Sequence, residues 1–280
     1  MSLKGKSNLE DIAMVRLVML GTGHAMVTKC YNTCFVLDND NGSVMVDAGG
    51  GNGILTQVEK AGLDWSKIKA LFITHAHTDH ILGGIWVLRK INTLIKHNKY
   101  DGFFKVYGFA ENLNYLKYNC DFLLNDSLSE QIQLISINGE GKFTECGIEF
   151  EAININSTKK AQLGFRAVIS NYDKVLTMVC LGDEPCHETC EVYVKNADWL
   201  LSEAFCLRSE KELFHPYEKN HSTAYDAGQM AEKLGVKNLI LYHTEDSDLE
   251  NRAKRYAEEA GQIFTGNIFV PDDLEVIRIL

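Results

Sequence analysis

The sequence contains few prolines, no long uncharged apolar run and no excess of positive charge. Only three prolines occur in 280 residues, and no low-complexity linker divides the chain. We therefore expect a single domain over residues 1–280, with its core in about 15–280. No uncharged apolar run approaches the roughly 18 residues that a membrane span requires, so we do not expect an association with membranes.

The charge balance is acidic and limits the classes of partner. Aspartate and glutamate number 38 against 28 lysines and arginines, which gives a net charge of -10. A protein that coats nucleic acid depends on summed positive charge, so that role is excluded, although a local basic groove is not. Hydrophobic residues make up 45% and charged residues 24%, which indicates a folded chain rather than a disordered one.

The N-terminus and the cysteines favour a cytoplasmic protein. Acidic residues follow the first lysines, and Arg16 interrupts the only early apolar stretch, so no secretory signal is recognisable. The eight cysteines contain no CxxC pair, and without export we expect reduced, mostly buried thiols. Cys180, Cys186 and Cys190, which flank Asp183, leave a second zinc site as the alternative.

Short apolar runs alternate with helical patterns along the chain. Strands are predicted at residues 15–20, 34–37, 43–47, 70–74, 105–107, 148–153, 175–181, 199–202, 238–242 and 276–279. Helices are predicted at residues 53–61, 223–234 and 248–260, the second with Ser222 as its N-cap. This mixture of hairpins and alternating units indicates an α/β fold with layered sheets flanked by helices.

The stretch Thr74-His75-Ala76-His77-Thr78-Asp79-His80 carries the strongest chemical signal. Four potential metal ligands fall within six positions, directly after the predicted strand 70–74. A tight loop at a strand end can bring these side chains together, and His and Asp are common ligands of Zn²⁺ and similar ions. We therefore predict a metal site here.

The HxHxDH motif resembles the signature of the metallo-β-lactamase superfamily. This resemblance implies an α/β fold in the form of an αββα four-layer sandwich. It also implies that Asp47 supports the metal loop, that Asp183 bridges two metal ions, and that His243 is the last ligand. The resemblance spans about residues 15–250.

Within that superfamily the chain is most similar to the ribonuclease Z group. The segments that carry this likeness are Leu163-Gly164-Phe165-Arg166, Ser202-Glu203-Ala204-Phe205 and His221-Ser222-Thr223. In the second segment Ser202 replaces a histidine of the family. The resemblance implies that His221 works with Glu203 beside the metal centre.

Two departures from that group stand out. The family has a third histidine for the first metal site, but the corresponding position here is Ser157 or, counting from the other side, Thr158. No histidine occurs in residues 154–160, so we expect a weakened first site. Only about a dozen residues separate Arg166 from Cys180, too few for the long arm that many tRNA-maturing relatives carry.

The resemblance thus implies a metal-dependent hydrolase, specifically a phosphodiesterase similar to ribonuclease Z, and the absence of an export signal adds the expectation that it is cytoplasmic. Expected metal ligands are His75, His77, Asp79, His80, Asp183 and His243. Expected catalytic residues are Asp79, His221, Glu203 and Asp47, with His221 donating a proton and Glu203 favouring its protonated form. The cofactor is one or two divalent ions, with Zn²⁺ first and Mn²⁺ or Fe²⁺ as alternatives.

RNA and a smaller phosphodiester are both expected substrates, and the relatives imply a homodimer. Two alternatives stay open at this point. One is an ester, thioester or lactone hydrolase on the same fold. The other is a catalytically degenerate metal-binding protein, which the missing histidine favours.

Overall fold

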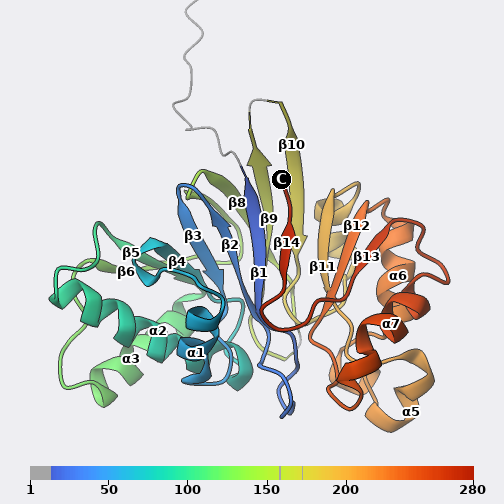
Figure 1. Cartoon of the computed structure of the whole chain (residues 1–280), viewed down its shortest axis with the longest axis horizontal. Coiled ribbons are helices and arrows are strands. Elements are labelled where there is room, and N and C mark those ends of the chain that lie inside the picture. Colours follow the sequence, from blue (N-terminus) through green and yellow to red (C-terminus); the bar gives the residue numbers. More distant parts are fainter. Residues whose placement is uncertain (1–13, 158, 172) are drawn as a thin grey trace, which may run out of the picture.

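Two seven-stranded sheets pack face to face, and helices cover the outer face of each sheet (Figure 1). The structure, a computed structural model, describes residues 14–280 except residues 158 and 172. The predicted αββα four-layer sandwich is confirmed. Within the described part of the chain, no helix is long and apolar enough to cross a membrane.

The first sheet has the strand order β14-β1-β2-β3-β4-β5-β6. Its strands are antiparallel from β14 to β3 and parallel from β3 to β6. Their bounds are β1 (Val15–Gly21), β2 (Cys34–Asn39), β3 (Gly42–Val46), β4 (Ile68–Phe72), β5 (Phe104–Gly108), β6 (Ile132–Ser136) and β14 (Val276–Arg278). The last strand of the chain therefore returns to pair with the first.

The second sheet has the order β13-β12-β11-β10-β9-β8-β7, antiparallel from β7 to β10 and parallel from β10 to β13. Its strands are β7 (Gly141–Glu145), β8 (Ile148–Asn154), β9 (Leu163–Ser170), β10 (Val175–Cys180), β11 (Trp199–Glu203), β12 (Asn238–Tyr242) and β13 (Asn267–Phe269). The β9–β10 hairpin projects beyond the body at the top of Figure 1, and only residues 171–174 join its strands.

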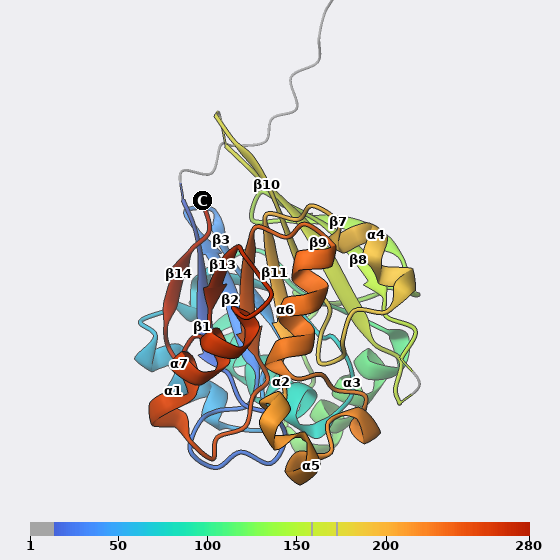
Figure 2. The same ribbon diagram turned by 90° about the vertical axis from the view of Figure 1, so that its right-hand side faces the viewer.

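The helices fall into two groups, one for each sheet. The first group comprises α1 (Gly53–Lys60), α2 (Thr78–Lys96) and α3 (Ala110–Leu123). The second comprises α4 (Glu191–Val194), α5 (Lys211–Phe214), α6 (Ala224–Lys233) and α7 (Leu249–Ala260). Short 3₁₀ helices occur at Trp65–Lys67, Glu188–Cys190, Arg208–Glu210 and Tyr217–Lys219. In Figure 2, α6 and α7 lie across the face of the second sheet.

Side chains that alternate between the two faces of each strand form three apolar layers. On β1, Leu17 and Met19 point into the core between the sheets, whereas Val18 and Leu20 point toward the first helical layer. This follows from the period of two along a strand. A third cluster, which includes Leu200 and Leu239, packs under α6 and α7. The central strands of the first sheet and β11 and β12 of the second are thus buried on both faces, whereas β7 and β8 carry polar side chains such as Lys142 and Glu149 on their outer face.

The predicted strands and helices are all present, with ends shifted by one to two residues. The prediction of Ser222 as the N-cap of α6 is wrong, because the cap is Thr223. The Thr223 hydroxyl accepts the Asp226 N–H, and the Asp226 carboxylate accepts the Thr223 N–H at 3.1 Å, which forms a capping box. Ser222 is engaged elsewhere, since its N–H donates to Glu203 at 2.6 Å.

Arg252 of α7 links chain segments that adjoin strands of both sheets. Its buried guanidinium donates to the hydroxyl oxygens of Thr22, after β1, and Thr244, after β12, at 2.9 and 3.1 Å. It also donates to the carbonyl oxygen of Pro271, ahead of β14, at 2.8 Å. Hydrogen bonds to a buried charged group are strong, so these three chain segments are held in a fixed relation.

Gly83 allows α2 to lie directly on the segment after β3. Its N–H donates to the Gly49 carbonyl oxygen at 2.8 Å, and a Cβ at this position would collide with the backbone of Ala48. We predict that Gly83→Ala lowers the free energy of unfolding by about 1–3 kcal/mol, the usual cost of overpacking. Urea unfolding measures this. The matched control is Gly51→Ala, which faces open space and should change the value by less than about 0.5 kcal/mol. Equal effects of both changes would contradict this account of the packing.

Candidate metal centre

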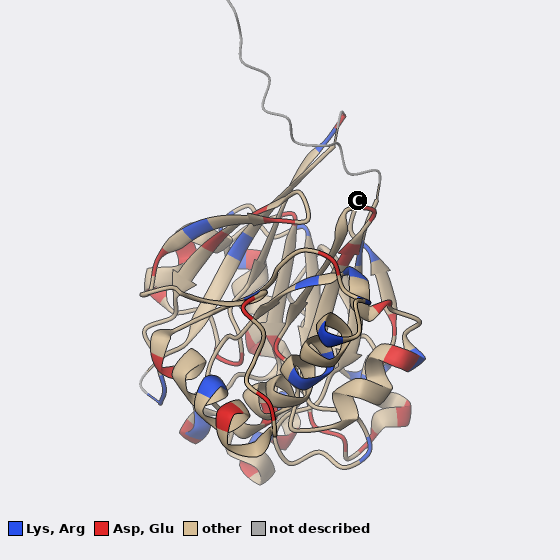
Figure 3. Cartoon of the chain, turned by 90° about the vertical axis from the view of Figure 1, so that its left-hand side faces the viewer, with Lys and Arg blue, Asp and Glu red and all other residues tan. Residues whose placement is uncertain are grey.

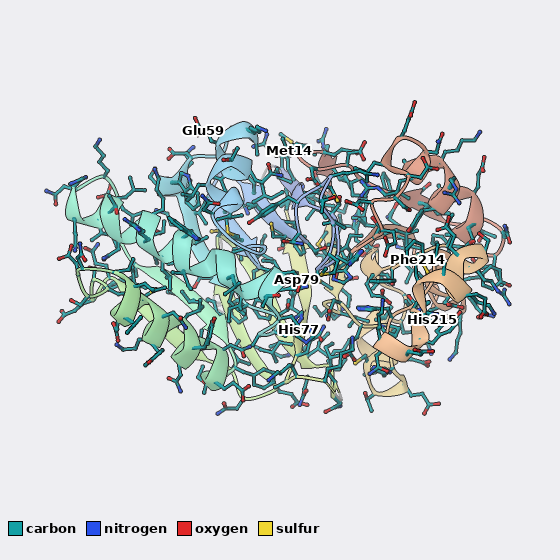
Figure 4. The ribbon with its side chains drawn as sticks, turned by 90° about the horizontal axis from the view of Figure 1, so that it is seen from below. Met14, Glu59, His77, Asp79, Phe214 and His215 are labelled. Atoms are coloured by element: carbon teal, nitrogen blue, oxygen red, sulfur yellow. The ribbon has the colours of Figure 1, made fainter. Side chains whose placement is uncertain are left out.

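The polar residues singled out from the sequence follow strand ends at a single edge of the sandwich. Their positions are Asp47 after β3, His75 to His80 after β4, Asp183 after β10, Glu203 at the end of β11 and His243 after β12. Seen from below, His77 and Asp79 lie at the middle of the molecule, between the half that carries α2 and α3 and the half that carries α5 (Figure 4). The site therefore joins both sheets.

The loop after β4 turns two histidine rings toward each other. His75 Nε2 and His77 Nδ1 are 2.8 Å apart. His77 is the N-cap residue of α2, so the chain has left the strand before it. The convergence expected from a tight loop is what the structure shows.

Asp47 supports this loop with three hydrogen bonds. Its carboxylate accepts the Thr74 N–H at 2.8 Å, the Thr74 hydroxyl at 2.6 Å and the His80 Nδ1–H at 2.7 Å. Because the Thr74 hydroxyl donates to Asp47, it accepts from His75 Nδ1 at 2.9 Å. Nδ1 is therefore the engaged ring nitrogen of both His75 and His80, which turns Nε2 of each ring into the site.

Asp183 Oδ2 faces three of the histidines. It lies 3.5 Å from His75 Nε2, 3.7 Å from His77 Nδ1 and 4.0 Å from His243 Nε2. On the other side, Asp79 Oδ2 lies 3.4 Å from His80 Nε2 and 3.5 Å from His243 Nε2. These distances define two of the four groups of potential ligand atoms among the described residues, namely His75, His77 and Asp183, and Asp79, His80 and His243.

The donor chemistry of these groups fits a divalent cation. His80 Nε2, His243 Nε2 and Asp183 Oδ1 are buried and make no hydrogen bond with any described group. Buried polar atoms are normally satisfied, so three that converge without partners are consistent with a site for a divalent cation. Carboxylate oxygens and imidazole nitrogens are the ligands that Zn²⁺, Mn²⁺ and Fe²⁺ take.

The histidines and carboxylates also shift one another's protonation. Burial alone would raise the pKa of Asp183, but His75 and His77 hold it well below its usual range. Burial alone would lower the pKa of His80, yet Asp79 and Asp47 raise it well above the ordinary histidine value. A cation that binds here must displace the His80 proton, so metal affinity falls as the pH is lowered.

A second functional pair, Glu203 and His221, lies beside the metal groups. Glu203 is completely buried, and its Oε2 is 3.4 Å from His221 Nδ1. The His221 ring stacks on Phe205 with centroids 4.8 Å apart and lies 5.1 Å from the His243 ring. The structure therefore brings His221 and Glu203 together next to the predicted ligands.

The protonation of this pair differs from the expectation. Burial raises the pKa of Glu203 to about 8 and lowers the pKa of His221 to about 4. The carboxyl group thus holds the proton near neutral pH, and it does not favour a protonated His221. The reason is that Glu203 is itself buried, so it is not the fixed negative charge that we expected.

The Ser157 side chain does not take the place of the missing histidine. The Ser157 hydroxyl donates to the Glu184 carboxylate, and it accepts the Lys159 N–H at 3.1 Å. Thr158, the other aligned position, lies outside the described residues. The first group of ligand atoms therefore consists of two histidines and Asp183.

His24 and the cysteines do not supply a further ligand in this structure. His24 Nδ1 accepts the Met26 N–H at 3.2 Å, and His24 Nε2 faces the Glu245 carboxylate at 3.0 Å, so both ring nitrogens are engaged. All eight cysteines are free, and among the described residues none joins a group of three potential ligands. Burial raises the pKa of Cys186 to about 12, which disfavours the thiolate that zinc requires.

The comparisons with known proteins agree with this geometry. The family model of the metallo-beta-lactamase superfamily matches residues 27–137, which include the metal loop. Over these residues the chain is similar to the metallo-beta-lactamase superfamily. It is 24% identical to ribonuclease Z of Thermococcus sibiricus and 24% identical to ribonuclease Z of Thermobifida fusca. The alignments cover 95% and 94% of this chain, and 97% and 94% of those proteins. The resemblance predicted from the sequence is confirmed.

Solved structures show the same superfamily fold. The metallo-beta-lactamase fold protein YhfI of Bacillus subtilis matches with a TM-score of 0.77 and 16% identity, over 95% of this chain and 100% of that one. The short form of human tRNase Z matches with a TM-score of 0.72 and 19% identity, over 94% and 98%. At these identities the likeness establishes the fold alone.

Three residues near the site were missed by sequence reasoning. Thr74 was placed only as a strand end, although its position between Asp47 and the first histidine of the motif could have indicated its bridging role. Lys159 and Lys219 line the same cavity as His77, Asp183 and His221, but they come from separate loops. No spacing pattern relates two such loops, so the sequence offered no signal for them.

We predict that the unmodified protein holds one ion firmly and a second ion weakly. Ser157→His should add an imidazole to the two-histidine group and raise the metal content toward about two ions per chain. Metal analysis after dialysis against a chelator measures this, with Thr158→His as the control for the alternative alignment. Two firmly held ions in the unmodified protein would contradict the prediction.

We predict that Glu203 makes the metal-free protein less stable as the pH rises. A carboxyl whose folded pKa is raised from 4.5 to about 8 stabilises the fold while protonated, and this stability is lost as the pH rises toward 8. His221 and His243, with pKa values lowered to about 4, act in the opposite direction only below about 6.5.

Between about pH 6.5 and 8, His80, whose folded pKa is also raised, lowers the stability in the same direction, so the part due to Glu203 is isolated by comparing a variant with the unmodified protein. In this pH range the unfolding free energy of the unmodified protein should fall more steeply than that of Glu203→Gln, by about 1.4 kcal/mol per pH unit. Urea unfolding of the chelator-treated protein at several pH values measures it. An unchanged slope in the variant would show that Glu203 does not hold this proton.

Proposed function

We propose that this protein is a divalent-metal-dependent phosphodiesterase that cleaves RNA or a smaller phosphodiester. The observation that carries this proposal is the convergence of two His/Asp groups on Asp183, beside the Glu203–His221 pair. The similarity to ribonuclease Z over nearly the whole chain supports the same reaction class.

The residues that would hold the metal are His75, His77 and Asp183 for one ion, and Asp79, His80 and His243 for the other, with Asp183 between them. Bound divalent ions supply positive charge that activates water and offsets the charge of a phosphodiester. Asp47 keeps two of the ligand imidazoles in the required tautomer through its bonds to His80 and Thr74. It is therefore a positioning residue.

His221 and Glu203 would deliver a proton to the leaving oxygen. A neutral His221 gives up the proton on Nε2 and takes the Glu203 proton at Nδ1, 3.4 Å away. The raised pKa of Glu203, about 8, keeps that proton available near neutral pH. Phe205, stacked on the His221 ring, fixes the ring plane for this transfer.

The cavity favours a small or single-stranded substrate. Its volume is about 440 Å³, within the range of sites for small molecules. The β9–β10 hairpin lies at the opposite edge from the site, so it offers no grip on a substrate held there. On the side that carries α2 and α3, basic and acidic positions are interspersed rather than gathered into a basic surface (Figure 3).

A catalytically degenerate metal-binding protein is the second candidate, and Ser157 is the observation that favours it. Its hydroxyl is engaged with Glu184 rather than facing the metal groups.

An activity panel separates the candidates. A phosphodiesterase hydrolyses bis(p-nitrophenyl) phosphate, an ester or lactone hydrolase prefers esters or lactones, and a degenerate protein binds metal without turnover. Failure to hydrolyse any diester with metal bound would overturn the proposal. A cytoplasmic location and a homodimer remain part of this proposal.

We predict that His221→Ala lowers kcat for an unactivated phosphodiester roughly 10²–10⁴-fold while the metal content is unchanged. The loss should be smaller for bis(p-nitrophenyl) phosphate, whose leaving group needs no proton. Asp183→Ala is the matched comparison, because it should lose both metal and activity. A loss of metal in His221→Ala would instead show that His221 is a ligand.

A further inference from the structure

Two lysines line the cavity that contains the metal groups. The cavity is bounded by His77, Asp79, Asp183, His221 and His243 on its metal side, and Lys159 and Lys219 also line it. Lys159 follows β8, and Lys219 ends the short helix Tyr217–Lys219, so the two cations come from different parts of the second half of the chain. The proposed reaction does not use either of them.

The charges of both lysines are available to a ligand. Lys159 Nζ is 4.0 Å from Glu184, the limit of an ion pair, and that carboxylate also bonds to Ser157 and lies 3.2 Å from His187. Lys219 makes no ion pair with any described residue, and its Nζ lies 4.8 Å from the centre of the Phe205 ring. Lysines elsewhere pair closely, for example Lys105 with Glu145 at 2.6 Å.

The Phe205 ring lies near both the Lys219 ammonium group and the histidines of the site. Phe205 contacts Lys219, and it also stacks on His221, whose ring lies 5.1 Å from His243. An ammonium group near an aromatic ring is weakly held, so it can move to bind an anion without losing a strong partner. Lys159 approaches the same space from the β8–β9 loop, where the family histidine is replaced.

We propose that Lys159 and Lys219 form an anion subsite for a second phosphate group of the substrate. The preferred substrate is then a phosphodiester that also carries a phosphomonoester, such as a short oligonucleotide with a terminal phosphate. This inference rests on the proposed function, because the metal side of the cavity takes the scissile group. Lysine ammonium groups bind phosphate through charge-assisted hydrogen bonds.

The test compares nucleotides that differ only in the number of phosphates. Adenosine 3′,5′-bisphosphate, adenosine 5′-monophosphate and adenosine 3′-monophosphate are titrated by calorimetry into the zinc-loaded full chain. The bisphosphate should bind roughly 10–100-fold more tightly than either monophosphate, as charge-assisted bonds imply. Lys159→Ala and Lys219→Ala should each reduce this ratio, and the double variant should bring it close to one.

The control is Lys254→Ala on α7, which removes the same charge away from the cavity and should leave the ratio unchanged. Lys219→Arg keeps the positive charge and should preserve the ratio, and an unchanged zinc content in each alanine variant shows that it still folds. Equal binding of bisphosphate and monophosphates, or a ratio that survives in the double variant, overturns the subsite.

Hydrolysis of bis(p-nitrophenyl) phosphate, measured on the same preparation, separates the two proposals. Hydrolysis without a bisphosphate preference would remove the subsite and leave the proposed function standing. A lysine-dependent preference without hydrolysis would support the subsite and overturn the proposed function.

Discussion

The buried Asp47 carboxylate is the constraint on which the rest of the site depends. It follows β3 in a left-handed backbone conformation, with φ at 54°, which is rare for a residue other than glycine. Its three bonds to Thr74 and His80 satisfy its charge, position the metal loop and fix the tautomers of His75 and His80. Without that carboxylate, the N–H and hydroxyl groups of Thr74 and the Nδ1–H of His80 would lose their shared acceptor in the interior.

The sandwich then brings the remaining groups to this loop. Parallel strands of the second sheet end at the same edge, so Asp183, Glu203 and His243 arrive beside the histidines from elements far away in the sequence. His243 also has a left-handed backbone, with φ at 58°. Such strain persists only where the surroundings enforce it, and here the link from Arg252 to Thr244 does so.

The sequence predicted the layers and most strands, because these follow from the periodicity of apolar residues along the chain. One compact motif and the family resemblance named the polar residues that converge at the strand ends, and their role as metal ligands stays a prediction. The sequence did not predict α2, which contains Gly83 and Gly84. The structure shows that Gly83 is needed for close packing on Ala48. It also missed the direction of the Glu203 and His221 pKa shifts, which depend on burial rather than on neighbours in sequence. The cavity lysines lie on separate loops, and only the folded chain relates them.

An anomalous difference map from crystals of the zinc-loaded protein, measured at the zinc edge, tests the central claim most directly. The account predicts density on both sides of Asp183, stronger next to Asp79, His80 and His243 than next to His75 and His77. Zinc bound instead at Cys186 and Cys190, or the absence of density at Asp183, would contradict it.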